Sequence, residues 1–460
     1  MKEKTKNILA VLSAAFMSFV GILTETSLNV TFPTMMKQFN VALATVQWTT
    51  TGYLLTIAII MICSSYLNER FTAKQLFVVA CGGFMVGSVI SAFAPNFSIL
   101  LLGRLISALG AGISTPLMFN LVTEIIPRDK WGVYMGIAGL VVAMAPTLGP
   151  AFGGITNFYL SWRWIFIFAT IIALIVFIAG VLVIGKYHEQ VKSDFDWLTF
   201  IILASAFITL TVGVNQISKG ITSPLFWLLL IATTILVLFF VKLSQKSTKK
   251  LLDLAVFKQK AFVWGALAYF LLQFNNIGIS FVLPNYVQIV GHQNSLIGGL
   301  ILLPGSIIAG LLNPYFGSLY DKKGAKLPLY LGGSFMMLGC LLFMIFGLNL
   351  SVLMIVIFYG IMMLGHRMSF SNTLAESLKV EKGELRADAT AVCQTSQQLA
   401  GSVGTTILAV IISIWQKKPN ITYSLGTAQG SQAAFIFTVI ISLIIIFSDW
   451  KMFKAENKRL

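Results

Sequence analysis

Residues 8–30 read ILAVLSAAFMSFVGILTETSLNV, an apolar run that contains a single carboxylate, Glu25. A run of about 20 apolar residues is long enough to cross roughly 30 Å of hydrocarbon as a helix. A carboxylate inside such a segment must be neutralised, paired or hydrated, at a cost of roughly 2.5–3.5 kcal/mol on insertion scales. We therefore expect a membrane span in which Glu25 takes up and releases a proton.

Apolar runs of this length recur along the whole chain. Of its 460 residues, 57% are hydrophobic and only 10% are charged, which is unlike a soluble domain. Because backbone groups in lipid must be satisfied within one element, we expect helices rather than barrel strands. This predicts an all-α membrane protein with fourteen transmembrane helices. The expected spans are 8–31, 46–67, 75–94, 98–125, 133–156, 163–185, 197–215, 224–243, 261–289, 296–319, 327–347, 351–376, 391–415 and 432–450.

The net charge of +16 reflects membrane topology in this interpretation. Fourteen spans place both termini on one side of the membrane, and the tails and loops on that side carry 25 of the 32 Lys and Arg residues. Two more, Arg104 and Arg367, lie within spans, and the opposite loops hold Lys37, Arg163, Lys219, Lys417 and Lys418. Such an asymmetry places both termini in the cytoplasm. It also argues against a nucleic-acid partner.

Cysteine usage suggests neither disulfides nor a metal site. The four cysteines lie in or at the end of apolar spans, and none forms a CxxC pair: Cys63, Cys81, Cys340 and Cys393. We expect them to be packing residues. The apolar run after Met1–Lys6 is too long for a signal-peptide core, so we expect it to be the first span.

The two halves of the chain resemble each other in sequence at an offset of 251 or 252 residues. The matching pairs are Pro33 with Pro284, Glu69 with Asp321, Lys74 with Lys326, Asn120 with Asn372, Glu124 with Glu376, and Gly149 with Gly401. Many transporters are built from such repeats. We expect two pseudo-symmetric six-helix bundles, residues 1–193 and 261–460, separated by two additional helices in 194–245. The basic linker 246–260 is either an amphipathic segment on anionic lipid or a solvated loop.

The turn at residues 317–326 reads GSLYDKKGAK. It resembles the loop signature G-x-L-x-D-x-x-G-x-K of the major facilitator superfamily. In the first half Ser65, Leu67, Glu69, Thr72 and Lys74 occupy the same positions, with both glycines replaced. An ordinary basic turn is the alternative interpretation.

Two further acids lie at span ends beside basic loops, where they serve either gate salt bridges or helix-end solvation. Together with the loop motifs, they complete the expected cytoplasmic gate: Glu69, Lys74, Glu124, Asp321, Lys326 and Glu376. Among the acids, we expect only Glu25 to lie well inside the membrane.

The stretch 145–154 reads APTLGPAFGG. Small residues allow close helix packing, and a proline removes a backbone donor and permits a bend. The stretch resembles the antiporter motif of drug:proton exchangers in the same superfamily. The resemblance implies a conformational role for Gly149, Pro150, Gly153 and Gly154; a generic small-residue packing face is the alternative.

Arg104 lies in the stretch 102–112, LGRLISALGAG, which resembles the superfamily motif with a functional arginine in this span. Arginine stays charged and needs a partner, and Glu25 is the natural counter-ion. The stretch 25–33, ETSLNVTFP, resembles the D-x-x-x-N-x-x-x-P signature of fourteen-span drug:proton antiporters, with Glu in place of Asp. This resemblance implies proton coupling through Glu25 and Arg104, and a purely structural pair is the alternative. His366 beside Arg367 is either a packing residue or a proton carrier.

Polar and aromatic residues on helices expected to line a central cavity are candidate substrate contacts. Apolar pockets with a few polar anchors suit drug-like ligands, and aromatic rings suit cations. The candidates are Asn29, Trp48, Tyr53, Phe274, Asn275, Asn276, Phe281, Gln394, Gln397 and Gln398. Packing between helices is the alternative for each.

The resemblance implies a proton-coupled multidrug efflux antiporter that exports amphipathic zwitterionic or monocationic drugs by alternating access. The alternative is a proton-coupled transporter of an endogenous metabolite or lipid precursor. The expected partners are drugs, protons and the lipid bilayer, for a monomer in a bacterial cell membrane. The sequence has no nucleotide loop, metal cluster or Ser/His/Asp arrangement, so we expect neither a cofactor nor an enzyme.

Overall fold

The computed structural model describes residues 3–185, 195–220, 222–246, 251–379 and 385–456. Within these ranges the chain is helical and contains no strand, and 14 helical segments are long and apolar enough to cross a membrane. The predicted all-α fold with fourteen spans is therefore confirmed.

The helices follow the predicted spans closely. In chain order they are α1 (Glu3–Leu28), α2 (Phe32–Phe39), α3 (Leu43–Val46), α4 (Trp48–Ile62), α5 (Ser64–Arg70), α6 (Ala73–Ala92), α7 (Phe97–Ile125), α8 (Trp131–Tyr159), α9 (Arg163–Val183), α10 (Trp197–Gln216), α11 (Pro224–Lys246), α12 (Lys260–Ile289), α13 (Ser295–Leu300), α14 (Leu303–Leu311), α15 (Asn313–Lys323), α16 (Lys326–Phe346), α17 (Val352–Lys379), α18 (Leu385–Gln416) and α19 (Tyr423–Glu456). Short 3-10 segments lie at Asn29–Thr31, Arg128–Lys130, Ile217–Lys219 and Leu254–Lys258.

The first and last spans are longer than the hydropathy of the sequence suggests. The first continues through the 3-10 turn Asn29–Thr31 into α2, where Pro33 lies in the first turn. A proline is tolerated there because the first helical N–H groups have no intrahelical partner. The last helix ends at Glu456, so Asp449 lies within it and is fully buried. Asp449 is thus, like Glu25, an acid buried inside the protein.

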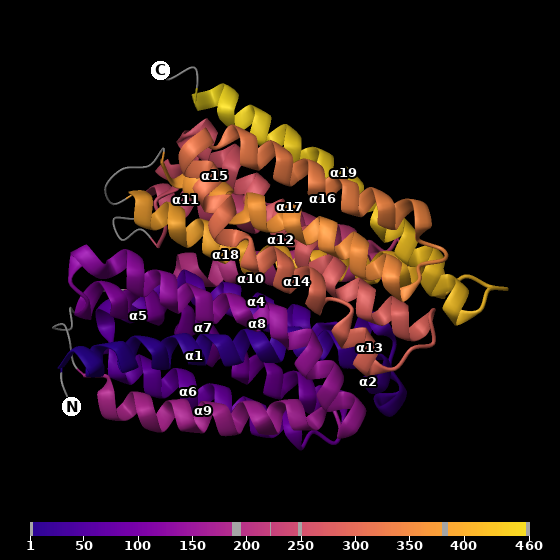
Figure 1. Ribbon diagram of the computed structural model, residues 1–460, viewed down its shortest axis with the longest axis horizontal. Coiled ribbons are helices and arrows are strands. Elements are labelled where there is room, and N and C mark those ends of the chain that lie inside the picture. The colour runs from indigo at the N-terminus through magenta and orange to yellow at the C-terminus, as the bar shows by residue number, and fades with distance from the viewer. Residues whose placement is uncertain (1–2, 186–194, 221, 247–250, 380–384, 457–460) are drawn as a thin grey trace.

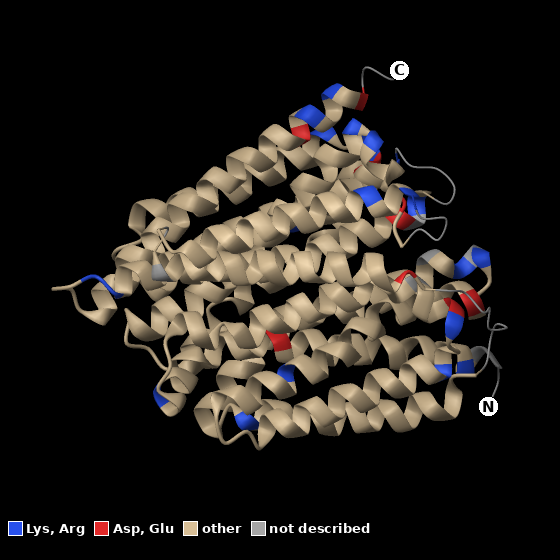
Figure 2. Ribbon diagram, turned by 180° about the vertical axis from the view of Figure 1, so that it is seen from behind, with Lys and Arg blue, Asp and Glu red and all other residues tan. Residues whose placement is uncertain are grey.

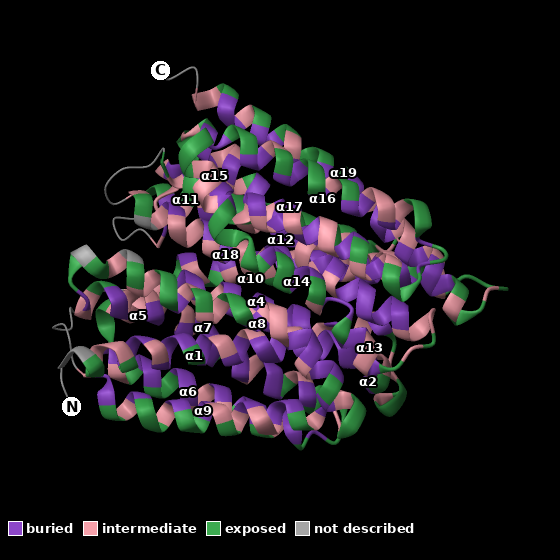
Figure 3. Cartoon of the chain, viewed as in Figure 1, coloured by how far each residue is buried: buried purple, intermediate pink, exposed green. Residues whose placement is uncertain are grey.

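The helices form two groups that lie side by side (Figure 1). Helices α1–α9, here the first half, pack around one apolar cluster, and α12–α19, here the second half, contribute most of another. The inserted α10 packs against α11 and also touches α4 and α18, so it contacts both halves. Large apolar side chains are exposed along the outer faces, as expected of a surface in contact with lipid (Figure 3).

The bundle has two chemically different ends. Helix α1 begins at one of them and α19 ends there, so we call it the terminal end. Charged residues gather at this end (Figure 2). Both α2 and α13 lie at the opposite, far end (Figure 1). The sequence places most basic residues in loops on the side of the termini, and the fold brings those loops to one end.

Hydrogen bonds hold the two halves together toward the far end. Gln288 on α12 donates to the carbonyl oxygen of Val30 (2.8 Å), and Asn285 donates to that of Asn29 (3.3 Å). In the first turn of α4, the Thr51 hydroxyl lies 3.0 Å from that of Thr405 on α18. These contacts close the far end of the bundle.

Candidate functional site

Arg104 of α7 is fully buried in the first half, where its side chain lies near α4 and near Phe166 of α9. Its Nε donates to the carbonyl oxygen of Thr49 (3.2 Å), and its guanidinium carbon lies 3.7 Å from the centroid of the Tyr53 ring. The Tyr53 hydroxyl in turn donates to the carbonyl oxygen of Gly21 on α1 (3.0 Å). A backbone carbonyl and an aromatic face are both favourable for a cation, so α4 partly solvates the arginine.

Glu25 lies on α1 beside this cluster and is 4% exposed. Glu25 interacts electrostatically with the guanidinium of Arg104 and with the hydroxyl group of Tyr53. No direct salt bridge joins Glu25 to Arg104, however, in the part of the chain that the structure describes. The two charges therefore interact at a distance, and the carboxyl group of Glu25 is not locked into an ion pair.

The glycine motif lies on α8, which packs against α1 in its own half and against α13 of the second half. The Ser27 hydroxyl on α1 donates to the carbonyl oxygen of Gly149 (2.9 Å), and a side chain at Gly153 would clash with the backbone of Ser27. Gly154 faces the second half, where an added Cβ would lie 2.5 Å from the carbonyl oxygen of Ser295. Gly149 and Gly153 therefore pack against α1 within the first half, and Gly154 meets the second half.

Five of the ten candidate substrate residues, including Asn275, are buried in helix contacts. Asn29 accepts a hydrogen bond from Thr50 (2.9 Å), and Phe281 packs against Phe32 across the two halves (5.8 Å between ring centroids). Tyr53 holds Arg104, and Phe274 packs against α18 and α19. The half-buried candidates are Trp48, Asn276, Gln394, Gln397 and Gln398.

The two further polar candidates contact neighbouring helices. Asn275 donates to the carbonyl oxygen of Thr438 (3.1 Å) on α19. Gln397 on α18 accepts a hydrogen bond from the Tyr269 hydroxyl (2.7 Å).

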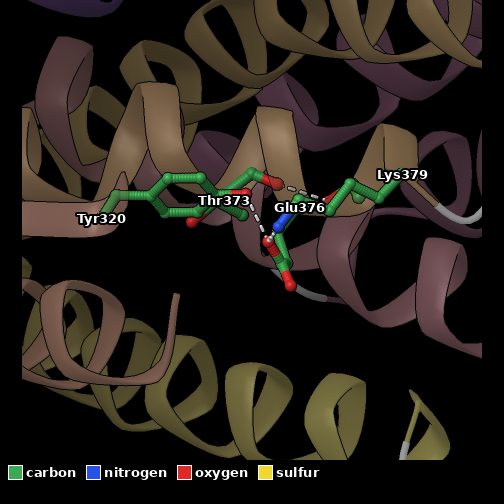
Figure 4. A network of polar contacts seen from close by, with 5 residues as sticks. Tyr320, Thr373, Glu376 and Lys379 are labelled. Atoms are coloured by element: carbon green, nitrogen blue, oxygen red, sulfur yellow. Dashed lines mark hydrogen bonds and ion pairs between the residues drawn. The ribbon is translucent and has the colours of Figure 1, made fainter. Parts of the chain in front are cut away.

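The candidate gate residues lie at the terminal end, where Glu376 forms a polar network. Figure 4 shows Tyr320 of α15 reaching Glu376 of α17, which accepts its hydroxyl hydrogen bond and pairs with Lys379 (2.6 Å). This network joins helices within the second half. By contrast, the side chains of Glu69 and Asp321 are exposed.

The remaining gate residues have varied surroundings. Glu124 is half-buried, as is Lys74, and the Lys326 amine lies 5.8 Å from the Phe453 ring centroid. The repeat between the two halves and the loop signature predicted where these residues lie. Neither pattern predicts which side chain each residue contacts.

Sequence reasoning missed the residues that join the halves, notably Thr51, Asn285 and Gln288. Polar residues at i and i+3 or i+4 in an apolar helix were the available signal, since an amide in a membrane helix needs a partner. It also missed Asp449, which lies inside the expected span 432–450, because hydropathy does not distinguish a buried carboxyl group from one at a helix end.

A family model described as Major Facilitator Superfamily matches residues 14–405. The chain belongs to the major facilitator superfamily. Lincomycin resistance protein LmrB of Bacillus subtilis is 32% identical over 97% of this chain and 95% of its own length. A multidrug resistance protein B homolog of Mycobacterium tuberculosis is 25% identical over 87% of this chain and 74% of its own.

The fold also matches solved transporter structures. A bacterial homolog of the human lysosomal transporter Spinster, in an inward-facing conformation, has a TM-score of 0.70 over 98% of both chains, at 13% identity. Such a likeness shows the fold alone. Together, the family and the fourteen candidate spans establish a multi-pass membrane protein of this superfamily of transporters.

Proposed function

We propose that the protein is a proton-coupled antiporter that exports amphipathic, zwitterionic or monocationic drugs. The names of two similar proteins, one of lincomycin resistance and one of multidrug resistance, support drug export. The observation that carries the coupling is Glu25: a buried carboxyl beside a buried arginine, with no direct salt bridge to it among the described residues.

The coupling follows from the cost of burying charge. When Glu25 is protonated, Arg104 carries the only full charge of this cluster, and a cationic substrate is repelled. When Glu25 is ionised, the cluster is neutral overall and tolerates a cationic group. Proton and drug would therefore compete, with the proton bound from outside and released to the more alkaline cytoplasm.

Alternating access would use the contacts that close the far end. In our proposal the termini are cytoplasmic, so the far end is the outer side, and rocking of the halves would break the bonds of Val30 and Asn29 to α12. Gly149, Pro150, Gly153 and Gly154 would let α8 slide between them. Glu69, Lys74, Glu124, Asp321, Lys326 and Glu376 would form the inner gate. Drug would contact the predicted substrate residues, of which Trp48, Asn276, Gln394 and Gln398 are half-buried.

Drug susceptibility of a pump-deficient bacterial host tests this function. Expression should raise the inhibitory concentration of amphipathic cationic and zwitterionic drugs, and an agent that collapses the proton gradient should remove the protection. If protection is absent for every drug class while membrane expression is normal, an endogenous metabolite or lipid precursor becomes the better substrate assignment.

A further inference from the structure

Arg367 on α17 is the second arginine within a span, and the proposed coupling does not use it. It is half-buried, and its Nε is buried without a hydrogen-bond partner. In the described part of the chain no carboxylate forms a salt bridge with it. Its electrostatic neighbour is Tyr359, two turns earlier on the same helix. A cation inside a membrane bundle without a counter-ion is costly, so an anion from outside the protein would stabilise it.

Two contacts define how α12 and α17 pair along their length. The Ser280 hydroxyl lies 3.2 Å from that of Tyr359, and the Tyr269 ring stacks on Phe370 with centroids 4.4 Å apart. The helices run antiparallel. From Ser280 to Tyr269 the chain goes back 11 positions on α12, and from Tyr359 to Phe370 it goes forward 11 positions on α17, so both contacts belong to one register. In that register Gln273 is level with His366.

Several polar atoms on this part of the two helices are buried without partners. They are Oε1 of Gln273, Oδ1 of Asn276, both ring nitrogens of His366 and Nε of Arg367. Buried polar groups are normally hydrogen-bonded, so a concentration of unmatched atoms at one depth indicates a place that receives polar groups from elsewhere. Tyr359, held by the hydroxyls of Ser280 and Ser306 (3.2 and 3.5 Å), bounds the region toward the far end.

The geometry points to a carboxylate-binding subsite at Arg367, on the α12–α17 face of the second half. A guanidinium offers a planar fork of donors that matches a carboxylate, and the amide oxygens of Gln273 and Asn276 can accept from an ammonium or hydroxyl group. This inference rests on the proposed drug export and refines its substrate class. Zwitterions should be preferred to monocations, because a monocation leaves Arg367 without a counter-ion.

Equilibrium binding of a matched ligand pair tests the subsite. The pair is a zwitterionic fluoroquinolone and its methyl ester, which keeps the amine and lacks the carboxylate, measured on purified protein in lipid nanodiscs. Wild type should bind the acid roughly tenfold or more tightly than the ester, the effect expected of a hydrogen-bonded charge pair. Arg367→Gln should abolish that preference by weakening the acid alone, and Arg367→Lys should retain part of it.

Arg163→Gln is the matched control, because Arg163 binds the carbonyl oxygen of Ala94 near the far end (2.9 Å). It should leave the ratio of acid to ester unchanged. Equal binding of acid and ester by the wild-type protein would overturn the subsite, and this outcome does not depend on whether any variant folds. Equal weakening of both ligands by Arg367→Gln would also overturn it. Export of both compounds without discrimination would refute the subsite alone. Selective acid binding without any export would refute the proposed function alone.

Discussion

Ser27 and Gly149 connect the first and fifth membrane spans through one hydrogen bond, from the serine hydroxyl to the glycine carbonyl oxygen (2.9 Å). One turn later Gly153 meets the Ser27 backbone, while Gly154 meets Ser295 across the two halves. Helix α8 therefore has glycine both where it packs against α1 in its own half and where it meets the second half. A helix with such close contacts on two sides can slide against its neighbours only if no side chain projects at the contact positions.

A methyl group at Gly153 should impair transport, because the added Cβ would clash with the backbone of Ser27. Gly153→Leu should be worse. Gly139→Ala on the same helix is the control, since a Cβ there meets nothing within 4 Å, and alanine favours a helix by roughly 0.5–1 kcal/mol. Dye efflux normalised to membrane protein should fall for Gly153→Ala only. Equal efflux by both variants would remove the steric basis of the motif.

Loss of the Gln288 side chain should favour opening of the far end. Gln288→Ala removes its bond to Val30 across the halves, which is worth about 1 kcal/mol or roughly fivefold in population. Gln432→Ala removes a similar bond within the second half, to Met344 (3.1 Å), and serves as control. Spin-label distances between the exposed positions Lys37 and Asn349 should lengthen in the first variant. Lengthening in both, or in neither, would contradict a gating role.

Asp449 should be a neutral acid in the folded protein. It is fully buried, and both carboxylate oxygens are without hydrogen-bond partners among the described residues. Ionising it there is costly, whereas the unfolded chain ionises it freely, so wild-type stability should fall as pH rises. Asp449→Asn should keep wild-type thermal stability in acid and exceed it in alkali.

Thermal unfolding in detergent across pH measures this effect. Glu69→Gln, which changes an exposed acid, should leave the pH profile unaltered. Strong destabilisation by Asp449→Asn at every pH would show that an ionised carboxylate is required.

The sequence predicted the spans well because lipid imposes one dominant pattern on helices, a continuous apolar run. It predicted the ends of the first and last spans less well, since α2 and the last turns of α19 are amphipathic and protected by neighbouring helices. The need of Arg104 for a partner was predictable from its charge. Its contacts with Thr49 and Tyr53 were not predictable, because they depend on how α4 packs against α7, which a single sequence does not specify.

The measurement that tests the central claim most directly is drug-driven proton movement in proteoliposomes containing Glu25→Gln. An outward drug gradient should move protons in wild-type vesicles and fail to do so in the variant, because glutamine occupies the same space but binds no proton. Glu25→Asp should retain part of the coupling. Glu25→Gln should also bind a cationic drug more weakly, because it leaves the charge of Arg104 uncompensated, as protonated Glu25 does. Full proton-coupled antiport by Glu25→Gln would contradict the account and remove Glu25 from the mechanism.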